Sequence, residues 1–408
     1  MTAKGVTERA LVVVAALVAV LGTMAPPASA QTLRERLDDA LTVNGVSRAK
    51  TGAFAFNLRT GRVVYGWQAR RSFKPASNEK LGVALAALRR LGASYRIRTE
   101  LIGAGSRRGA TWRGRLFLKG HGDPTLGAGD LRRLARKLRA TGVRRVTGRV
   151  VGDETYFDAR RTAPGWRASY YKIESPPLSA LVVNRARVNG RTVDKPALAA
   201  AKAFRQALVA AGISVAGRAA TGPAPNDSRV LAVVRSKTVA AIVRHMNKIS
   251  DNFYAEMLVK HLGAVLRDRG TTAAGCRVVR RVLQTRNVPL AGVRIADGSG
   301  LSQYNRATAR AVGAILLAAW RDAAVRGPFF SSLAIAGVDG TLEERMRSGP
   351  AYGRVRAKTG TLRTASALSG YVGTRYVFSI LQNDNPISWT RARRSQNRFA
   401  QTLARALR

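Results

Sequence analysis

The chain has 408 residues, of which 70 are Lys or Arg and 23 are Asp or Glu, so its formal net charge is +47. Its single cysteine, Cys276, excludes an intramolecular disulfide and a cysteine-rich zinc site. The three histidines, His121, His245 and His261, lack the spacing of a zinc hydrolase, and we predict no metal and no cofactor. A hydrophobic fraction of 46% indicates a globular chain with a large core.

The high positive charge has two interpretations. The basic residues either bind a polyanion, such as nucleic acid, an anionic cell-wall polymer or a membrane surface, or they reflect a compositional bias with solvated basic faces. They are spread along the whole chain, and no nucleic-acid motif accompanies them. We therefore favour the compositional bias and expect no nucleic-acid partner, while a wall polymer or a membrane surface stays open.

The first 30 residues have the pattern of a secretory signal peptide. Lys4 and Arg9 precede an apolar run that ends near Leu21, and Ala28-Ser29-Ala30 supplies an A-x-A cleavage site. The apolar run is short for a membrane span, so an uncleaved anchor is the less favoured alternative. We predict an exported protein, periplasmic or cell-wall/extracellular, after cleavage near Ala30.

The hydrophobic periodicity of the remaining chain predicts helices and strands in two groups. A helix over 32–43, strands at 52–57 and 62–67, and a buried helix starting at Ser77 come first. Short strands at 101–102, 116–118, 149–151 and 180–183 then alternate with helices at 130–141 and 197–211. Helices return from 238, followed by strands at 356–361, 367–372 and 376–381 and a closing amphipathic helix. We expect an α/β (α+β) fold in which a catalytic domain, 31–95 and 236–408, is split by an inserted α+β domain, 96–235.

Three short motifs occur in a fixed order along the chain: Ser77-Asn78-Glu79-Lys80, Ser250-Asp251-Asn252 and Lys358-Thr359-Gly360. Each alone is weak, because Ser77 or Ser250 could simply cap a helix and Lys358 could be a solvated strand residue. In this order S-x-x-K, S-D-N and K-T-G are typical of penicillin-binding proteins and class A β-lactamases.

The motif residues suit nucleophilic catalysis by serine. Ser77 needs a base, and Lys80 lies one helical turn away. Burial and the nearby charge of Lys358 are expected to lower the pKa of Lys80. Ser250 would relay a proton to the leaving nitrogen.

The other motif residues suit substrate binding. Asn252 can hold both Lys80 and a substrate amide, and Lys358 and Thr359 suit a substrate carboxylate. Gly360 would let a ligand backbone come close, and the backbone N–H groups of the nucleophile and Thr361 would form an oxyanion hole.

Further segments extend the pattern: Lys119-Gly-His-Gly-Asp-Pro-Thr-Leu126, Pro176-Pro177-Leu178-Ser-Ala-Leu181, Asp297-Gly-Ser-Gly-Leu-Ser302 and Gly337-Val-Asp-Gly-Thr-Leu342. With them the chain resembles the D-alanyl-D-alanine carboxypeptidase/endopeptidase family of low-molecular-mass penicillin-binding proteins. The resemblance implies a β-lactamase/transpeptidase-like domain split by an insertion. It also implies removal of terminal D-Ala from peptidoglycan stem peptides through a Ser77 acyl-enzyme, and acylation of Ser77 by β-lactam antibiotics.

One departure from the family and two alternatives remain. A third domain nested in the insertion is missing or vestigial, because Asn184 runs almost directly to Pro196. A β-lactamase or esterase of the same fold is one alternative, although no E-x-x-L-N segment follows Ser250 to supply a deacylating glutamate. A catalytically dead wall-binding protein is the other.

The remaining candidates have structural interpretations. We expect His245 and His261 at the surface or as helix caps, and Cys276 as a small buried hydrophobe. Asp297-Gly-Ser-Gly is read as a turn, the segment from Gly337 as the rim of a cleft, and the basic C-terminal helix as packed on the sheet.

Overall fold

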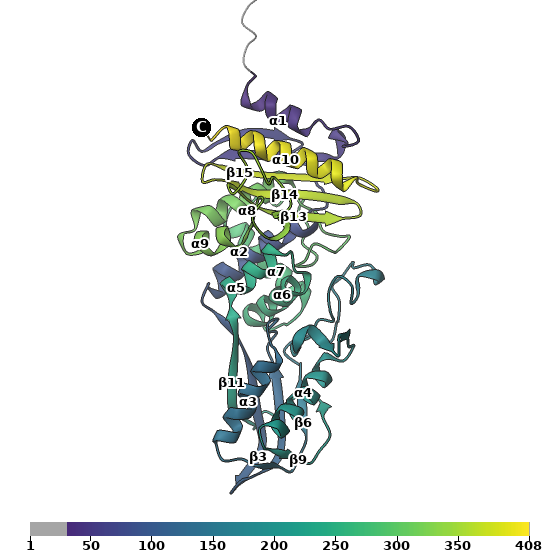
Figure 1. Cartoon of the computed structure of the whole chain (residues 1–408), viewed down its shortest axis with the longest axis vertical. Coiled ribbons are helices and arrows are strands. Elements are labelled where there is room, and N and C mark those ends of the chain that lie inside the picture. The colour runs from purple at the N-terminus through teal and green to yellow at the C-terminus, as the bar shows by residue number, and fades with distance from the viewer. Residues whose placement is uncertain (1–30, 408) are drawn as a thin grey trace, which may run out of the picture.

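The computed structural model describes residues 31–407, so the predicted signal peptide lies outside the described residues. These residues form an elongated molecule with one β-sheet at each end and a layer of helices between them (Figure 1). The mixture of helices and antiparallel strands confirms the predicted fold class. None of the helices in residues 31–407 is long and apolar enough to cross a membrane.

The upper sheet of Figure 1 combines the two ends of the described chain. Its six strands lie in the order β12-β13-β14-β15-β1-β2, and all neighbours are antiparallel. The pairing of β1 with β15 joins the N-terminal hairpin to the last three strands. The strands are β1 (Thr51–Asn57), β2 (Arg62–Trp67), β12 (Ala334–Ile335), β13 (Val355–Leu362), β14 (Ala365–Val372) and β15 (Tyr376–Asn383).

Helices cover both faces of this sheet, and β1 and β14 are buried at every position. On one face α1 (Leu33–Leu41) and α10 (Trp389–Arg405) pack through apolar side chains such as Leu37, Phe399 and Leu403. The closing helix therefore packs on the sheet, as its periodicity predicted. On the other face lie α2 (Glu79–Leu91), α5 (Val239–Lys248), α6 (Asn252–Arg267), α7 (Thr272–Thr285), α8 (Ala309–Arg321) and α9 (Ala323–Ser332).

The central helix α2 is buried from Glu79 to Leu88. The helix that we expected to start at Ser77 starts two residues later, because Ala76–Asn78 form a separate 3-10 turn. This turn is held between α2 and the sheet.

The lower sheet lies at the far end of the molecule and comes from the predicted insertion (Figure 1). Its main path is β10-β6-β4-β3-β11, and β5 and β9 extend it beside β4. Helices α3 (Ala128–Ala140) and α4 (Pro196–Ala210) cover one face with a separate apolar core. The strands are β3 (Arg96–Arg108), β4 (Thr111–Gly120), β5 (Arg145–Val146), β6 (Val150–Asp153), β9 (Ser214–Val215), β10 (Ala220–Thr221) and β11 (Arg229–Thr238).

The strand predicted at 180–183 is wrong, because these residues form a buried loop. The backbone of Ala180 accepts a hydrogen bond from Gly122 N at 2.8 Å, and Gly120 lies directly against it. A short apolar run fits a buried loop as well as a strand. Where a nested third domain would be inserted, the described chain has the short hairpin β7 (Arg187–Val188) and β8 (Arg191–Thr192). The domain limits themselves stay a prediction.

Residues 154–193, which we call the arm, leave the lower sheet and pack against α6. Phe157 and Leu178 of the arm share a buried apolar cluster with Phe253 and Met257 of α6. The arm therefore links the insertion to the helical layer that carries the motifs.

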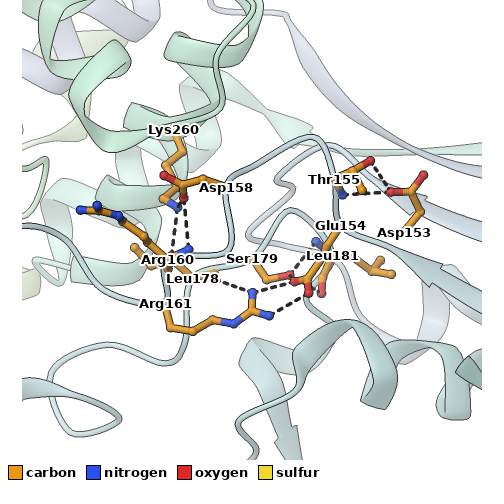
Figure 2. A network of polar contacts seen from close by, with 10 residues as sticks. All are labelled: Asp153, Glu154, Thr155, Asp158, Arg160, Arg161, Leu178, Ser179, Leu181 and Lys260. Atoms are coloured by element: carbon orange, nitrogen blue, oxygen red, sulfur yellow. Dashed lines mark hydrogen bonds and ion pairs between the residues drawn. The ribbon is translucent and has the colours of Figure 1, made fainter. Parts of the chain in front are cut away.

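Ion pairs fix the base of the arm (Figure 2). Arg161 donates two hydrogen bonds to the Glu154 carboxylate, at 2.6 and 2.7 Å. Lys260 of α6 is fully buried, pairs with Asp158 and donates to Arg160 O at 3.1 Å. A buried ammonium is costly without a partner, so these contacts fix the position of the arm relative to α6.

Candidate active site

Ser77 lies in the 3-10 turn that precedes α2, one turn from Lys80. Lys80 Nζ lies 2.8 Å from Ser77 Oγ, and the Lys80 side chain is fully buried. Ala76, directly before the serine, has φ of 47°, in the left-handed region that costs a non-glycine residue free energy. The surrounding structure must therefore hold this turn in place.

The Lys80 ammonium donates to three oxygens from three different parts of the chain. Besides Ser77 Oγ, these are Asn252 Oδ1 at 2.8 Å and the backbone oxygen of Ser299 at 2.5 Å. Three acceptors match the three protons of an ammonium group. Lys80 thus joins the first motif, the second motif and a turn that our sequence reasoning treated as structural.

The second motif lies between α5 and α6, as predicted. Asp251 caps α6 by accepting a hydrogen bond from Tyr254 N at 3.0 Å. Although burial opposes it, hydrogen bonding to His245 and the charge of Arg185 hold the pKa of Asp251 below its usual value. His245 therefore supports the helix cap, as expected. Ser250 has φ of 62° and lies in the same cleft as Ser77, but it is not among the three partners of Lys80.

The third motif lies on β13, beside the 3-10 turn that carries Ser77. Lys358 is fully buried and donates to Thr359 O at 2.9 Å, while Asn78 Nδ2 donates to Lys358 O at 3.1 Å. Thr359 Oγ1 donates to Thr341 Oγ1 at 2.8 Å. Thr341 lines the cleft, which confirms that the segment from Gly337 shapes its rim.

Gly360 packs against the turn that carries Ser77. A Cβ atom at this position would lie 3.0 Å from Pro75 O and 3.1 Å from the Ala76 side chain. The glycine therefore lets β13 approach the turn that carries Ser77, and the close approach of a ligand backbone stays a prediction. The next residue, Thr361, is exposed and lines the cleft.

Both motif lysines are buried, and burial disfavours their charged forms. Burial lowers the pKa of Lys80 to about 8, although the negative charges of Asp297 and Glu256 act in the opposite direction. Burial also lowers the pKa of Lys358 well below its usual value, and the charge of Lys80 adds to this effect.

The sequence reasoning missed how the turn 297–302 takes part in the site. The buried Asp297 carboxylate accepts from Gly300 N at 2.9 Å and Ser302 N at 2.7 Å. Glu256 Oε1 accepts from Gly298 N at 3.0 Å and Ser299 N at 2.8 Å, which aims the Ser299 carbonyl at Lys80. The sequence did contain one indication of this contact: Glu256 lies one helical turn after Asn252 and therefore on the same face of α6.

Glu256 is buried against Lys80 and Asp297. Burial and the charge of Asp297 raise the pKa of Glu256 to about 8, and its Oε2 has no hydrogen-bond partner among the described residues. The carboxyl therefore holds the turn 297–302 without requiring a permanent charge.

The arm also reaches the site. Trp166 Nε1 donates to Asp297 Oδ2 at 2.9 Å. Asn252 Nδ2 donates to Glu174 O at 3.0 Å and lies 3.3 Å from Glu174 Oε2. The arm thus places a glutamate beside Asn252, and no local spacing in the sequence could have indicated this neighbour.

Of the remaining predictions, the one for Cys276 is confirmed and the one for His261 is wrong. Cys276 is buried, as predicted. His261 is not at the surface: its Nδ1 lies 2.8 Å from His121 O, and burial lowers its pKa to about 4. Within residues 31–407, no cluster of three or more His, Cys, Asp or Glu side chains could hold a metal ion.

The motif residues meet in one open cleft of about 1240 Å³. Ser77, Ser250, Asn252, Thr359 and Thr361 line it, and Lys80, Lys358 and Gly360 lie buried behind them. A serine paired with a buried lysine, between a helical layer and an antiparallel sheet, defines a serine hydrolase of the β-lactamase/transpeptidase-like fold.

The comparisons with known proteins place the chain within that class. The family model of the D-Ala-D-Ala carboxypeptidase 3 (S13) family matches residues 33–193 and 185–406, and the chain belongs to this family. It is a serine-type D-Ala-D-Ala carboxypeptidase, a peptidase that hydrolyses its substrate. The split of the match within the arm agrees with an inserted domain.

Individual relatives agree with this family. A D-alanyl-D-alanine carboxypeptidase of an Actinomadura species is 32% identical over 86% of this chain and 81% of the relative. A carboxypeptidase of Mycobacterium tuberculosis is 31% identical over 76% of this chain and 71% of the relative.

Solved structures share the fold. Penicillin binding protein 4 of Haemophilus influenzae has a TM-score of 0.80 at 22% identity and covers 93% of this chain and 99% of its own. A predatory peptidoglycan endopeptidase of Bdellovibrio bacteriovorus has a TM-score of 0.61 at 18% identity and covers 88% of this chain and 93% of its own.

Replacing Gly300 by Ala should displace the nucleophile turn. Gly300 has φ of +88°, and an added Cβ would lie 2.0 Å from Ala76 O and 3.0 Å from Ser77 N. Displacement of a reacting group by about 1 Å can cost 100-fold in rate. We expect the rate of acylation by benzylpenicillin, followed by stopped-flow mass spectrometry, to fall at least about tenfold.

Gly61→Ala is the matched control, because Gly61 also has a positive φ, +68°, but nothing lies within 4 Å of the added Cβ. Its acylation rate should equal that of the wild type. Equal losses in the two variants would mean that backbone strain, rather than the contact with Ala76, explains the effect.

Proposed function

We propose that the chain is an exported enzyme that removes the terminal D-Ala of peptidoglycan stem peptides, with Ser77 as its nucleophile and Lys80 as its base. The observation that carries this proposal is the 2.8 Å contact between Lys80 Nζ and Ser77 Oγ inside an open cleft. The signal-peptide pattern of residues 1–30 supports export.

Acylation begins when neutral Lys80 takes the proton of Ser77 Oγ, which attacks the carbonyl carbon between the two D-Ala residues. The backbone N–H groups of Ser77 and Thr361 stabilise the oxyanion of the tetrahedral intermediate. The C–N bond then breaks, and the proton held by Lys80 reaches the leaving nitrogen through Ser250, which lines the same cleft and must turn toward Lys80 in the substrate complex. Water hydrolyses the ester, releases the shortened peptide and restores Ser77.

The substrate's C-terminal carboxylate is bound by Lys358, Thr359 and Thr361. Lys358 is buried, and its hydrogen bond goes to a neutral backbone oxygen. Burial lowers its pKa, so an incoming carboxylate supplies the opposite charge that favours the ammonium form. The hydroxyl groups of Thr359 and Thr361 line the cleft at the end of the same strand. Asn252 orients a substrate amide while it holds Lys80.

The same site would accept β-lactams and cross-linked peptides. A β-lactam is a cyclic amide with a nearby carboxylate, so Ser77 opens the ring as it would attack the peptide bond. The cleft of about 1240 Å³ exceeds the roughly 300–1,000 Å³ of common ligand pockets, which favours a large substrate such as a cross-link. We therefore propose DD-endopeptidase activity besides the carboxypeptidase activity.

The Ser77→Ala variant should lose covalent labelling while it keeps its fold. We expect one penicilloyl adduct per wild-type chain by intact-mass spectrometry, none in the variant, and similar unfolding temperatures for both. D-Ala release from a pentapeptide should disappear in parallel. A folded wild-type chain that gains no adduct would instead favour the dead wall-binding protein.

Acylation should depend on pH through Lys80. Because only neutral Lys80 accepts the Ser77 proton, the rate should rise with pH and reach half its maximum near pH 8, where the pKa of Lys80 lies. The penicilloyl adduct formed per second, measured across this pH range, tests this. Lys80→Arg keeps the charge but does not release a proton, so it should remain inactive at every pH. A wild-type rate that does not change through pH 8 would argue against Lys80 as the base.

The β-lactamase alternative rests on the position of Glu174. Its carboxylate lies 3.3 Å from Asn252 Nδ2 at the cleft, where it could activate a deacylating water. In the proposed peptidase, Glu174→Gln should leave the lifetime of the penicilloyl adduct unchanged, because slow release reflects the absence of a deacylating base. A rapidly hydrolysed adduct that Glu174→Gln stabilises many-fold would support the β-lactamase.

A further inference from the structure

The catalytic cleft continues beyond the motif residues along α10. One side of this helix lines it, with residues at the spacing of successive turns, while the opposite side packs on the sheet. The wall is rich in guanidinium groups: Arg36, Arg345, Arg393, Arg394, Arg398 and Arg405. Among residues 31–407, three carboxylates line the same cleft, so it is strongly positive.

These arginines lack anionic partners within the described part of the chain. None of the six forms an ion pair with a carboxylate of residues 31–407, although thirteen Lys or Arg ion pairs occur among these residues. Of the three lining carboxylates, Glu344 pairs with Arg347 and Asp39 accepts from Gln31. Solvated surface arginines need no partner, but six on one concave wall repel one another and attract an anion.

Arg345 is the fixed centre of the wall. Its Nε and Nη2 donate to Asn397 Oδ1 at 3.0 and 2.7 Å, and Nη2 also donates to Gln396 Oε1 at 3.1 Å. Neutral amides thus orient the guanidinium without cancelling its charge. Burial and the charge of Arg393 lower the pKa of Arg345, which marks a cation that lacks compensation. A planar guanidinium held in one orientation suits bidentate binding of a carboxylate.

We propose that the part of this wall formed by Arg345 and by Arg393, Arg394 and Arg398 of α10 is a subsite for carboxylates of the peptidoglycan strand whose stem peptide reacts at Ser77. The inference rests on the proposed function. Because the wall and Ser77 line one continuous cleft, a single substrate can reach both, with its scissile bond at Ser77 and its other carboxylates at the wall. The subsite therefore favours acidic, strand-attached peptides over short neutral ones.

The test compares two substrates in three full-length mature proteins. One substrate is a disaccharide-peptide dimer released by muramidase, with its side-chain carboxylates free. The other is diacetyl-Lys-D-Ala-D-Ala, whose charge is confined to its C-terminus. Arg394 and Arg398, four residues apart on α10, are both changed to Gln. The control variant changes Arg132 and Arg136, which are exposed at the same spacing on α3 and outside the cleft.

We expect the α10 variant to lower kcat/KM for the acidic dimer about fivefold to tenfold, mainly through KM, and to leave the neutral peptide unchanged. The control variant should match the wild type on both substrates. Amidation of the side-chain carboxylates of the dimer, with the C-terminal carboxylate kept free, or high salt should remove the difference between the proteins. Equal losses on both substrates, or no loss on either, would overturn the subsite.

Two further measurements distinguish a failure of the proposed function from a failure of the proposed subsite. Benzylpenicillin labelling of Ser77 tests the proposed function alone, and binding of the acidic dimer to the Ser77→Ala protein tests the subsite without turnover. Poly(glycerol phosphate) is the competing probe. If it binds through Arg394 and Arg398 while the acidic dimer does not, the wall recognises a phosphate polymer and the carboxylate proposal is wrong.

Discussion

The site depends on one buried ammonium group. Lys80 is fully buried, and burying an ammonium group costs free energy. Hydrogen bonds to three oxygens, from Ser77, Asn252 and Ser299, offset this free energy. Each acceptor belongs to a different segment, so the nucleophile turn, the start of α6 and the turn 297–302 must be placed together. The same burial lowers the pKa of Lys80 toward the range where it can act as a base.

The second constraint is the attachment of the insertion. The arm is joined to α6 by the buried Lys260 and by a shared apolar cluster, and it then brings Trp166 to Asp297 and Glu174 to Asn252. The insertion thus forms part of the cleft rather than a separate appendage. Changes in the arm would act on the site through Asn252, the residue that also holds Lys80.

The structure shows where part of the net charge of +47 is concentrated. Most basic residues are spread over the surface, in line with the compositional interpretation, but six arginines lie together on the cleft wall. The helix that carries four of them packs on the sheet through its other side, so one element serves both the core and the cleft. The amphipathic pattern of α10 was enough to predict that it packs on the sheet. That its other side lines the cleft follows only from the positions of the neighbouring segments in the structure.

The sequence by itself determined the three motifs, their order, the split fold and the type of nucleophile, because S-x-x-K places two residues on one helical turn. It also located most strands and helices, since their periodicity follows from burial on one face. Only the tertiary structure decided that Gly360 faces the turn that carries Ser77, that residues 180–183 form a loop, and that Ser299, Glu256 and Glu174 lie beside the motif residues. These contacts join residues far apart in the chain, and local spacing carries no information about which distant surfaces will meet.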